Sequence, residues 1–318
     1  MFDTCSPRKD SKTVVLELPI TFENGFGPFE ETYSVLNQEP SSENLIGSPW
    51  VATYPSIKGI PDNWHHVVRY MEWLNARQFV YQNYHQGKIG PELYNSLLKS
   101  WNWVPDQTIL SKKPINCFVY VITGQDSYGN NVMRIDCNNN LDFSDETTFY
   151  PKALSRFWKT KNDQFKSGYK KFHMVQYESV RFGKIVPDSI PMILRYAPEQ
   201  VNEKLYWCSF PQYGVTTLSW KGRNYRIAIS RNFNGSSFYD ARIVALGESD
   251  DDKNLTFFQT IQIGGFLETG TLLSRSRFKY LGINQSENIL LLESAEEIKK
   301  RILCSKFQIV HAYTKQHS

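Results

Sequence analysis

Hydrophobic and polar residues alternate along much of the chain, in short runs rich in β-branched and aromatic residues that Gly, Pro and Asn separate. This two-residue period is typical of strands that bury one face, and it predicts a mainly β protein built of sandwich-like modules. The first strand is expected at 13–20, with a return strand at 31–36. The run 115–123 (INCFVYVIT) is apolar almost throughout, so it predicts a strand that is buried on both faces.

The hydrophobic period changes after residue 61, where apolar residues recur at helical spacing. A helix is expected from Asp62 to near Gly87. A second is expected from Pro91 to Trp101, because Pro is favoured in the first turn of a helix. Together they predict a helical hairpin at about 62–103, inserted into the β scaffold.

Strand and turn patterns then resume and continue to residue 293. Further strands are expected at 132–136, 172–180, 184–186 with a continuation at 187–196, 205–209, 215–220, 224–230, 242–247, 256–263, 278–281 and 289–293. Ser294 and Glu297 have capping-box spacing and predict a short C-terminal helix. The predicted domains are a flexible lead-in at 1–12, a β module with the helical hairpin at 13–155, a second β module at 156–293 and a C-terminal helix and tail at 294–318.

Composition and charge narrow the classes of partner. Hydrophobic residues make up 41% and charged residues 21% of the chain, which is typical of a folded protein. The net charge of +4 is spread along the chain and does not indicate a nucleic-acid partner. No run of about 18 apolar residues predicts a membrane span, and the N-terminus does not have the pattern of a signal peptide. Cys5 would carry a lipid anchor if it followed a lost signal peptide.

Five cysteines occur, at positions 5, 117, 137, 208 and 304. None forms a C-x-x-C pair, which argues against a dithiol redox centre and a zinc knuckle. Cys117 and Cys137 flank an expected hairpin whose turn lies near 126–130, so they would lie nearly opposite each other. The sequence leaves two alternatives open, a disulfide or a pair of inert thiols.

An oxygen-rich loop follows the second strand of that hairpin. Its candidate metal ligands are Asp136, Asn138, Asn140, Asp142, Asp145 and Glu146. Calcium takes six to eight oxygen ligands, and alternate residues of a curling loop supply them. The spacing is similar to an EF-hand loop, but Leu141 stands where Gly is usual and Thr147 where the closing Glu is usual. The loop predicts a structural calcium site, with an Asx-rich turn bonded to its own backbone as the alternative.

A second loop repeats this order in weaker form. The segments 119–140 and 217–234 both read as strand, turn, strand and Asn-rich loop, through duplication or independently. The second loop opens with Ser230 where the first has Asp136, and it closes with Asp240. With a single carboxylate it would hold a divalent ion poorly.

Three segments carry a family resemblance. The run 54–61 (YPSIKGIP), the helical hairpin and the loop 135–146 resemble the β-rich N-terminal region of bacterial envelope redoxin proteins of the TlpA type, which usually continue into a thioredoxin-like domain. The resemblance implies a periplasmic or cell-surface location and an association with thiol–disulfide chemistry. The chain departs from the family, because the segment after Glu293 is too short for a thioredoxin-like domain and has no C-x-x-C. The oxidoreductase activity is therefore not carried over.

Three functions follow from these patterns. The first is a non-catalytic, exported accessory or binding module with a structural calcium loop and an unknown protein or glycan partner. The second is a carbohydrate-binding or glycan-processing protein, suggested by 20 Phe, 18 Tyr and 8 Trp and by the candidate acids Asp188, Glu199, Asp240 and Glu248. The third is a thiol–disulfide oxidoreductase, which the lack of C-x-x-C disfavours.

Overall fold

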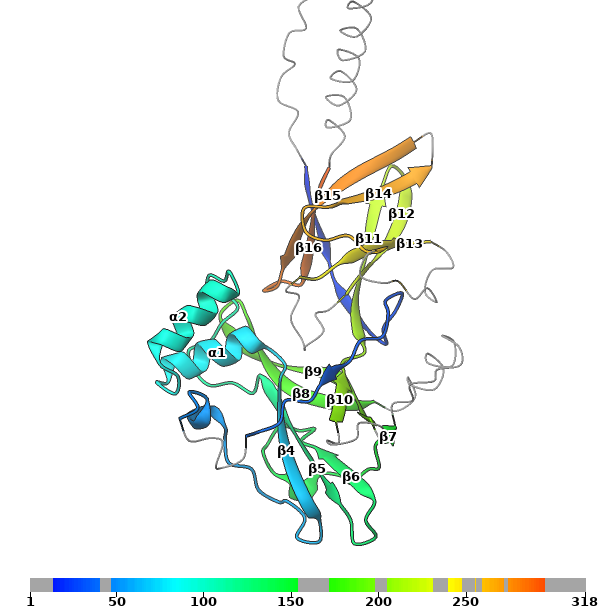
Figure 1. Cartoon of the computed structure of the whole chain (residues 1–318). Coiled ribbons are helices and arrows are strands. Elements are labelled where there is room, and N and C mark those ends of the chain that lie inside the picture. The colour runs from blue at the N-terminus through cyan, green and yellow to red at the C-terminus, as the bar shows by residue number, and fades with distance from the viewer. Residues whose placement is uncertain are drawn as a thin grey trace, which may run out of the picture.

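Figure 1 shows a computed structural model of the chain, which describes residues 14–40, 47–153, 172–197, 205–230, 240–247, 255, 259–271 and 274–294. Within these residues the fold is mainly β, with two α-helices inserted between strands. This confirms the predicted fold class. The strands form four sheets in two groups, and all pairs but one are antiparallel.

The first group is a β-sandwich that holds the first and the last described strands (Figure 1). One sheet has the order β1 (Val15–Pro19), β16 (Ile289–Ser294), β15 (Ser274–Asn284) and β14 (Phe266–Thr271). The other has the order β13 (Ile243–Leu246), β12 (Arg223–Ile229), β11 (Gln212–Trp220) and β2 (Thr21–Asn24). Ile227 of the second sheet packs with Phe278 and Leu290 of the first in one buried core, which holds the two sheets face to face.

The second group carries the helices. One sheet has the order β3 (Ser34–Val35), β10 (Leu205–Ser209), β9 (Lys184–Ala197) and β7 (Lys152–Ala153), and β8 (His173–Arg181) also pairs with β9. The other has the order β4 (His65–Trp73), β5 (Phe118–Gln125) and β6 (Asn131–Ile135). Val121 of β5 packs with Ile190 of β9 and Tyr206 of β10 in a second core.

Strand β5 is buried on both faces, as its unbroken apolar run predicted. Val121 faces the core shared with β9 and β10, whereas Tyr120 and Ile122 face a separate core that includes Phe143. Alternate residues of a strand point to opposite faces, so one short segment contributes to two cores. The loop after β6 is anchored against this strand.

The predicted helix at 62–86 is wrong in its first half, which is strand β4. Its residues pair with β5 from Trp73↔Phe118 to Val68↔Thr123, and the β-branched Val67 and Val68 suit this extended backbone. The first helix, α1 (Ala76–His85), begins after Asn75, whose side chain accepts a hydrogen bond from Gln78 N at 3.1 Å. The second helix, α2 (Pro91–Ser100), lies where the sequence predicted it.

Most other strands agree with the prediction, and the differences lie at its edges. The return strand expected at 31–36 is only β3, and the expected strand at 256–263 is described only as a bridge between Ile261 and Ile243. Strands β2 and β14 were not predicted. The C-terminal helix and tail at 294–318 lie outside the described residues beyond β16.

The sheets join distant parts of the chain. Strand β1 pairs with β16, β2 with β11, and β3 with β10. Each of these pairs takes one strand from either side of residue 155, which is the predicted boundary between the two β modules. The division into modules stays a prediction, and the pairings show that the N-terminal strands are integral to sheets formed by the second half.

Candidate ligand-binding site

The predicted cation loop, Asp136–Glu146, is folded around a buried carboxylate. Asp136 is fully buried at the end of β6, where its Oδ1 accepts a hydrogen bond from Asn140 N at 3.0 Å and its Oδ2 accepts one from Leu141 N at 2.9 Å. Burial raises the pKa of Asp136, and these backbone donors oppose that rise. The side chain therefore closes the loop onto its own backbone.

The other predicted ligands are linked mainly through Asp145 and Glu146. Asp145 Oδ2 accepts hydrogen bonds from Asn138 Nδ2 at 3.0 Å and from Asn140 Nδ2 at 2.9 Å. Glu146 Oε1 accepts one from Cys137 N at 2.6 Å. The structure thus brings Asp136, Asn138, Asn140, Asp145 and Glu146 into one hydrogen-bonded network.

Asp142 is turned away from this network. Its Oδ2 lies 2.9 Å from Lys58 Nζ, and its Oδ1 accepts from Ser144 N at 3.0 Å. The hydrogen bonds from Ser144 and Lys58 lower the pKa of Asp142 to about 2, and desolvation opposes this shift. Only its backbone N–H, which donates to Asn140 Oδ1 at 2.8 Å, joins the other predicted ligands.

The segment Lys58-Gly59, which we call the strap, packs against the loop through backbone hydrogen bonds. Lys58 N donates to Leu141 O at 3.0 Å, and Phe143 N donates to Lys58 O at 2.9 Å. Gly59 has φ +70°, and a Cβ there would lie 2.3 Å from Ser144 N, so only glycine permits this approach. Leu141 itself has φ 62°, the left-handed conformation that its position was expected to resist.

The charges of the network bear on whether it could bind a cation. Within the part of the chain that the structure describes, no three His, Cys, Asp or Glu side chains converge as a ready-made metal site. Burial raises the pKa of Glu146, and the charges of Asp136 and Asp145 raise it further. The three carboxylates therefore lie within electrostatic range of one another, and a hard cation placed among them would relieve their repulsion.

The described cysteines are free thiols. Cys117 and Cys208 are buried, Cys137 is half-buried, and no disulfide joins Cys117 to Cys137. Burial raises the pKa of all three thiols, for Cys137 to about 12 with a contribution from Glu146. A raised pKa makes a thiol a poor nucleophile at neutral pH. Cys5 and Cys304 lie outside the described residues.

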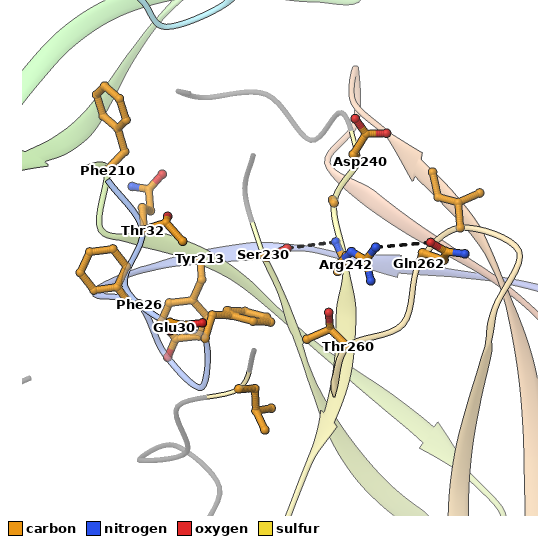
Figure 2. Close-up of a pocket in the computed structure, with 15 residues that line it drawn as sticks. Phe26, Glu30, Thr32, Phe210, Tyr213, Ser230, Asp240, Arg242, Thr260 and Gln262 are labelled. Atoms are coloured by element: carbon orange, nitrogen blue, oxygen red, sulfur yellow. Dashed lines mark hydrogen bonds between the residues drawn. The ribbon is translucent and has the colours of Figure 1, made fainter. Parts of the chain in front are cut away.

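A pocket of about 690 Å³ opens at one end of the sandwich (Figure 2). It lies where β2 and β12 end and where β11 and β13 begin, together with the segment 259–263. Its lining residues are Phe26, Phe29, Glu30, Thr32, Phe210, Gln212, Tyr213, Ser230, Asp240, Ala241, Arg242, Leu255, Thr260, Gln262 and Ile263.

One wall of the pocket is aromatic. Tyr213 donates a hydrogen bond from its hydroxyl to Glu23 Oε2 at 2.5 Å, and Phe29 meets its ring edge-on with 6.4 Å between ring centroids. Gly27 has φ +55°, and a Cβ there would lie 2.6 Å from the Tyr213 ring. Glycine at this position therefore lets the loop after β2 lie flat on Tyr213, which places Phe26 and Phe29 around it.

The opposite wall is polar, and Figure 2 places Asp240, Arg242, Thr260 and Gln262 on it. Arg242 Nη2 donates to Gln262 Oε1 at 3.3 Å, and the Arg242 backbone N donates to Ser230 Oγ at 3.0 Å. The aromatic wall supplies one further charge, Glu30, whose side chain is exposed at the pocket. A concave site with apolar rings facing a few convergent polar groups is the usual form of a small-molecule site.

Sequence reasoning found only the edge of this pocket. Ser230 and Asp240, the ends of the predicted second loop, both line it, and Asp240 was also a candidate acid. Of the other candidate acids, Asp188 is paired with Arg181 at 2.7 Å, and Glu199 and Glu248 lie outside the described residues. The aromatic wall was not predicted, because the glycines at positions 25 and 27 indicate only the end of a strand.

Exposed aromatic residues gather at one further place, the tip of the β5–β6 hairpin. Tyr128 and Tyr150 are 88% and 63% exposed, and the Tyr150 hydroxyl donates to Asp126 Oδ2 at 3.3 Å. Glycan hydrolysis needs two carboxylates in a cleft, whereas only Asp126 interacts with these rings among the contacts found in the described chain. The tip is therefore less complete as a site than the pocket.

Comparison of this chain with protein families, curated proteins and solved structures finds no match. No helix among the described residues is both long and apolar enough to cross a membrane. The features of the molecule that bear on its function are therefore the pocket and the Asp136–Glu146 loop.

Proposed function

We propose that this chain is a non-catalytic binding module whose ligand site is the pocket of the sandwich. The observation that carries the proposal is the pocket itself, in which an aromatic wall from the loop after β2 and the start of β11 faces a polar wall from the residues before β13 and the segment 259–263. Its volume of about 690 Å³ falls in the range that encloses a small organic ligand. Such a ligand would stack on the rings and exchange hydrogen bonds with the polar wall.

Binding is favoured over catalysis by the chemistry of the lining. Among the described lining residues there is no His or Cys, and the Ser230 hydroxyl already accepts from Arg242 N. A nucleophile needs an adjacent base within hydrogen-bond reach, and these lining residues do not supply one to Ser230. An exported accessory role remains part of the proposal on the resemblance to envelope redoxin proteins, and a glycan remains an alternative ligand.

A fragment screen by saturation-transfer NMR tests the proposal. Neutral, cationic and anionic aromatic fragments would be screened against the full chain and against Thr32→Trp, which places an indole in the pocket. Thr217→Trp is the matched control, because Thr217 is exposed on β11 and does not line the pocket. We expect hits on the wild type that persist in Thr217→Trp and disappear in Thr32→Trp. Hits that survive in Thr32→Trp would contradict the assignment.

We also propose a structural calcium ion in the Asp136–Glu146 loop. The mutual repulsion of Asp136, Asp145 and Glu146 supports this, because a cation placed among the three carboxylates would relieve it. The ion would be held by these carboxylates with amide oxygens from Asn138 and Asn140, and it would brace the loop against β5.

Calorimetry tests the calcium proposal. Calcium at about a hundred times its Kd should stabilise the fold by roughly 2.7 kcal/mol over the protein in EDTA. The double variant Asp145→Asn, Glu146→Gln should remove this difference, and magnesium should give less because it demands a tighter octahedral shell. An equal Tm in calcium and in EDTA would contradict the proposal.

A further inference from the structure

Negative side chains outnumber positive ones in the described lining of the pocket. Three described lining residues carry charge: Glu30 on the aromatic wall, and Asp240 and Arg242 on the opposite side. The described lining therefore has two carboxylates and one guanidinium, a net charge of −1 in a partly enclosed space. Low-dielectric walls strengthen the field that such a charge projects into a pocket.

The single cation is already engaged by the protein. Arg242 Nη2 donates to Gln262 Oε1 at 3.3 Å, which ties the guanidinium to the segment 259–263. By contrast, the carboxylates of Glu30 and Asp240 have no hydrogen-bond or ion-pair partner within the described part of the chain. As far as the described residues go, the pocket thus presents two acceptor groups that are available to a ligand or to water.

Asp240 is held in an uncommon backbone conformation. Its φ is 60°, in the left-handed region that asparagine and aspartate tolerate better than most residues. The chain then enters β13 through Ala241, which is fully buried and accepts a hydrogen bond from the Tyr280 hydroxyl at 3.1 Å. The buried Ala241 therefore anchors the backbone at Asp240 beside the pocket, and residues in this backbone conformation gather at functional sites.

The aromatic wall, like the two carboxylates, favours a positively charged ligand. The faces of Phe and Tyr rings carry partial negative charge and attract ammonium and guanidinium groups. Phe26, Phe29, Phe210 and Tyr213 supply these rings to the wall that also carries Glu30. A cationic group would therefore meet two carboxylates and the accessible parts of these largely buried rings, with Arg242 as the opposing charge on the described lining.

We propose that the pocket selects an organic cation, an ammonium or guanidinium group on a small apolar body. This inference rests on the proposed binding function and adds its ligand class. The apolar body lies against the aromatic wall, and the cationic group lies between Glu30 and Asp240.

A matched series of probes tests the charge preference. Phenylpropylamine, phenylpropanol and phenylpropionate share one body and end in a cation, a neutral hydroxyl and an anion, and cellobiose serves as a neutral sugar. Their Kd values would be measured by isothermal titration calorimetry on the full chain. Two partly exposed ion pairs predict that the amine binds about tenfold more tightly than the alcohol. Added salt of about 0.5 M should remove most of that preference and leave the alcohol unaffected.

The carboxylates are tested by neutral isosteres. Asp240→Asn keeps the tolerance for a left-handed backbone, and Glu30→Gln keeps the length of the side chain. Each should weaken amine binding by about threefold to fivefold, and the double variant should bind amine and alcohol equally. Glu17→Gln is the control, because Glu17 is exposed on β1 and does not line the pocket, and it should leave every Kd unchanged.

The outcomes separate this inference from the proposed function. Equal binding of amine and alcohol, abolished for both by Thr32→Trp, would overturn the cation preference and leave the pocket as a binding site. Tightest binding of phenylpropionate or of cellobiose would overturn the ligand class in the same way. If fragments bound nowhere in the pocket, the proposed function would fail together with this inference.

Discussion

The Asp136–Glu146 loop and the pocket are built in opposite ways. The loop is continuous in the sequence, and its side chains bond to one another and to its own backbone, as Asp136 does with Asn140 and Leu141. The pocket collects residues as far apart as Phe26 and Ile263. Its carboxylates, Glu30 and Asp240, have no partner among the described residues.

This difference separates two roles for polar side chains. A carboxylate that accepts several backbone N–H groups stabilises the local fold, and its removal leaves buried donors unpaired. A carboxylate with no partner contributes little to folding and remains available to a ligand. The loop therefore has the features of a structural element, with or without a cation, and the pocket has those of a binding site.

The largest expected effect is on the strap of the loop. In Gly59→Ala, the left-handed backbone costs about 1–2 kcal/mol, and the new Cβ must also move away from Ser144 N, which would lie at 2.3 Å. We expect a total loss of roughly 3 kcal/mol or more in the free energy of unfolding, measured by urea denaturation. Gly87→Ala is the control, since Gly87 has φ +69° with nothing near its Cβ position, and it should lose only about 1 kcal/mol. Equal losses would show that the strap does not lie against the loop.

A second prediction tests whether amide donors alone keep a buried carboxylate ionised. Glu72 on β4 is buried, and its carboxylate accepts from the backbone N and side-chain Nδ2 of Asn37, with no cationic partner among the described residues. Burial raises the pKa of Glu72 from 4.5 to about 7, and the bonds from Asn37 oppose this. The folded state then binds more protons than the unfolded state between pH 4.5 and about pH 7.

Stability from this group is therefore present at low pH and lost as pH rises through that window, by roughly 3 kcal/mol. Glu72→Gln should remove the dependence, so the variant should gain on the wild type by up to this amount between pH 5 and pH 8, approximately. Urea denaturation across this range measures the difference, with the exposed-site variant Glu17→Gln as control. A constant difference between Glu72→Gln and the wild type would mean that Asn37 suffices to keep Glu72 charged.

The third prediction has the smallest expected effect and compares the loop with the pocket through one variant in each. Asp136→Asn removes the charge that accepts from Asn140 N and Leu141 N, and it should lose about 1–3 kcal/mol of stability. Asp240→Asn makes the same chemical change at the pocket and should stay within about 0.5 kcal/mol of the wild type. Thermal denaturation in EDTA makes the comparison without a cation. Similar losses in both variants would remove the distinction between structural and available carboxylates.

Features built from neighbouring residues could be predicted from the sequence, whereas features built from distant residues could not. The two-faced strand β5, the hairpin turn near Asp126 and helix α2 were all predicted, because each depends on neighbours within a few residues. Strand β4 was mistaken for helix because its apolar residues also fit a helical period, and pairing with β5 decided the outcome. Propensity yields to tertiary pairing where the two conflict.

The loop was found in the sequence because its oxygens recur at alternate positions, and the structure brings most of them together. The pocket could not be found in this way. Its walls meet only because β2 pairs with β11 and β12 pairs with β13, and no local pattern encodes those pairings. The predicted second loop found one edge of the pocket, at Ser230 and Asp240. The aromatic edge could have been suspected from Gly27, which the structure shows with a positive φ and packed against Tyr213.

Ligand binding in the pocket can be observed in a crystal soaked with a brominated phenylpropylamine. We expect an anomalous bromine peak against the aromatic wall beside Tyr213, with the ammonium group between Glu30 and Asp240. A bromine peak elsewhere, or none in the pocket at a concentration that saturates binding in solution, would contradict ligand binding in the pocket.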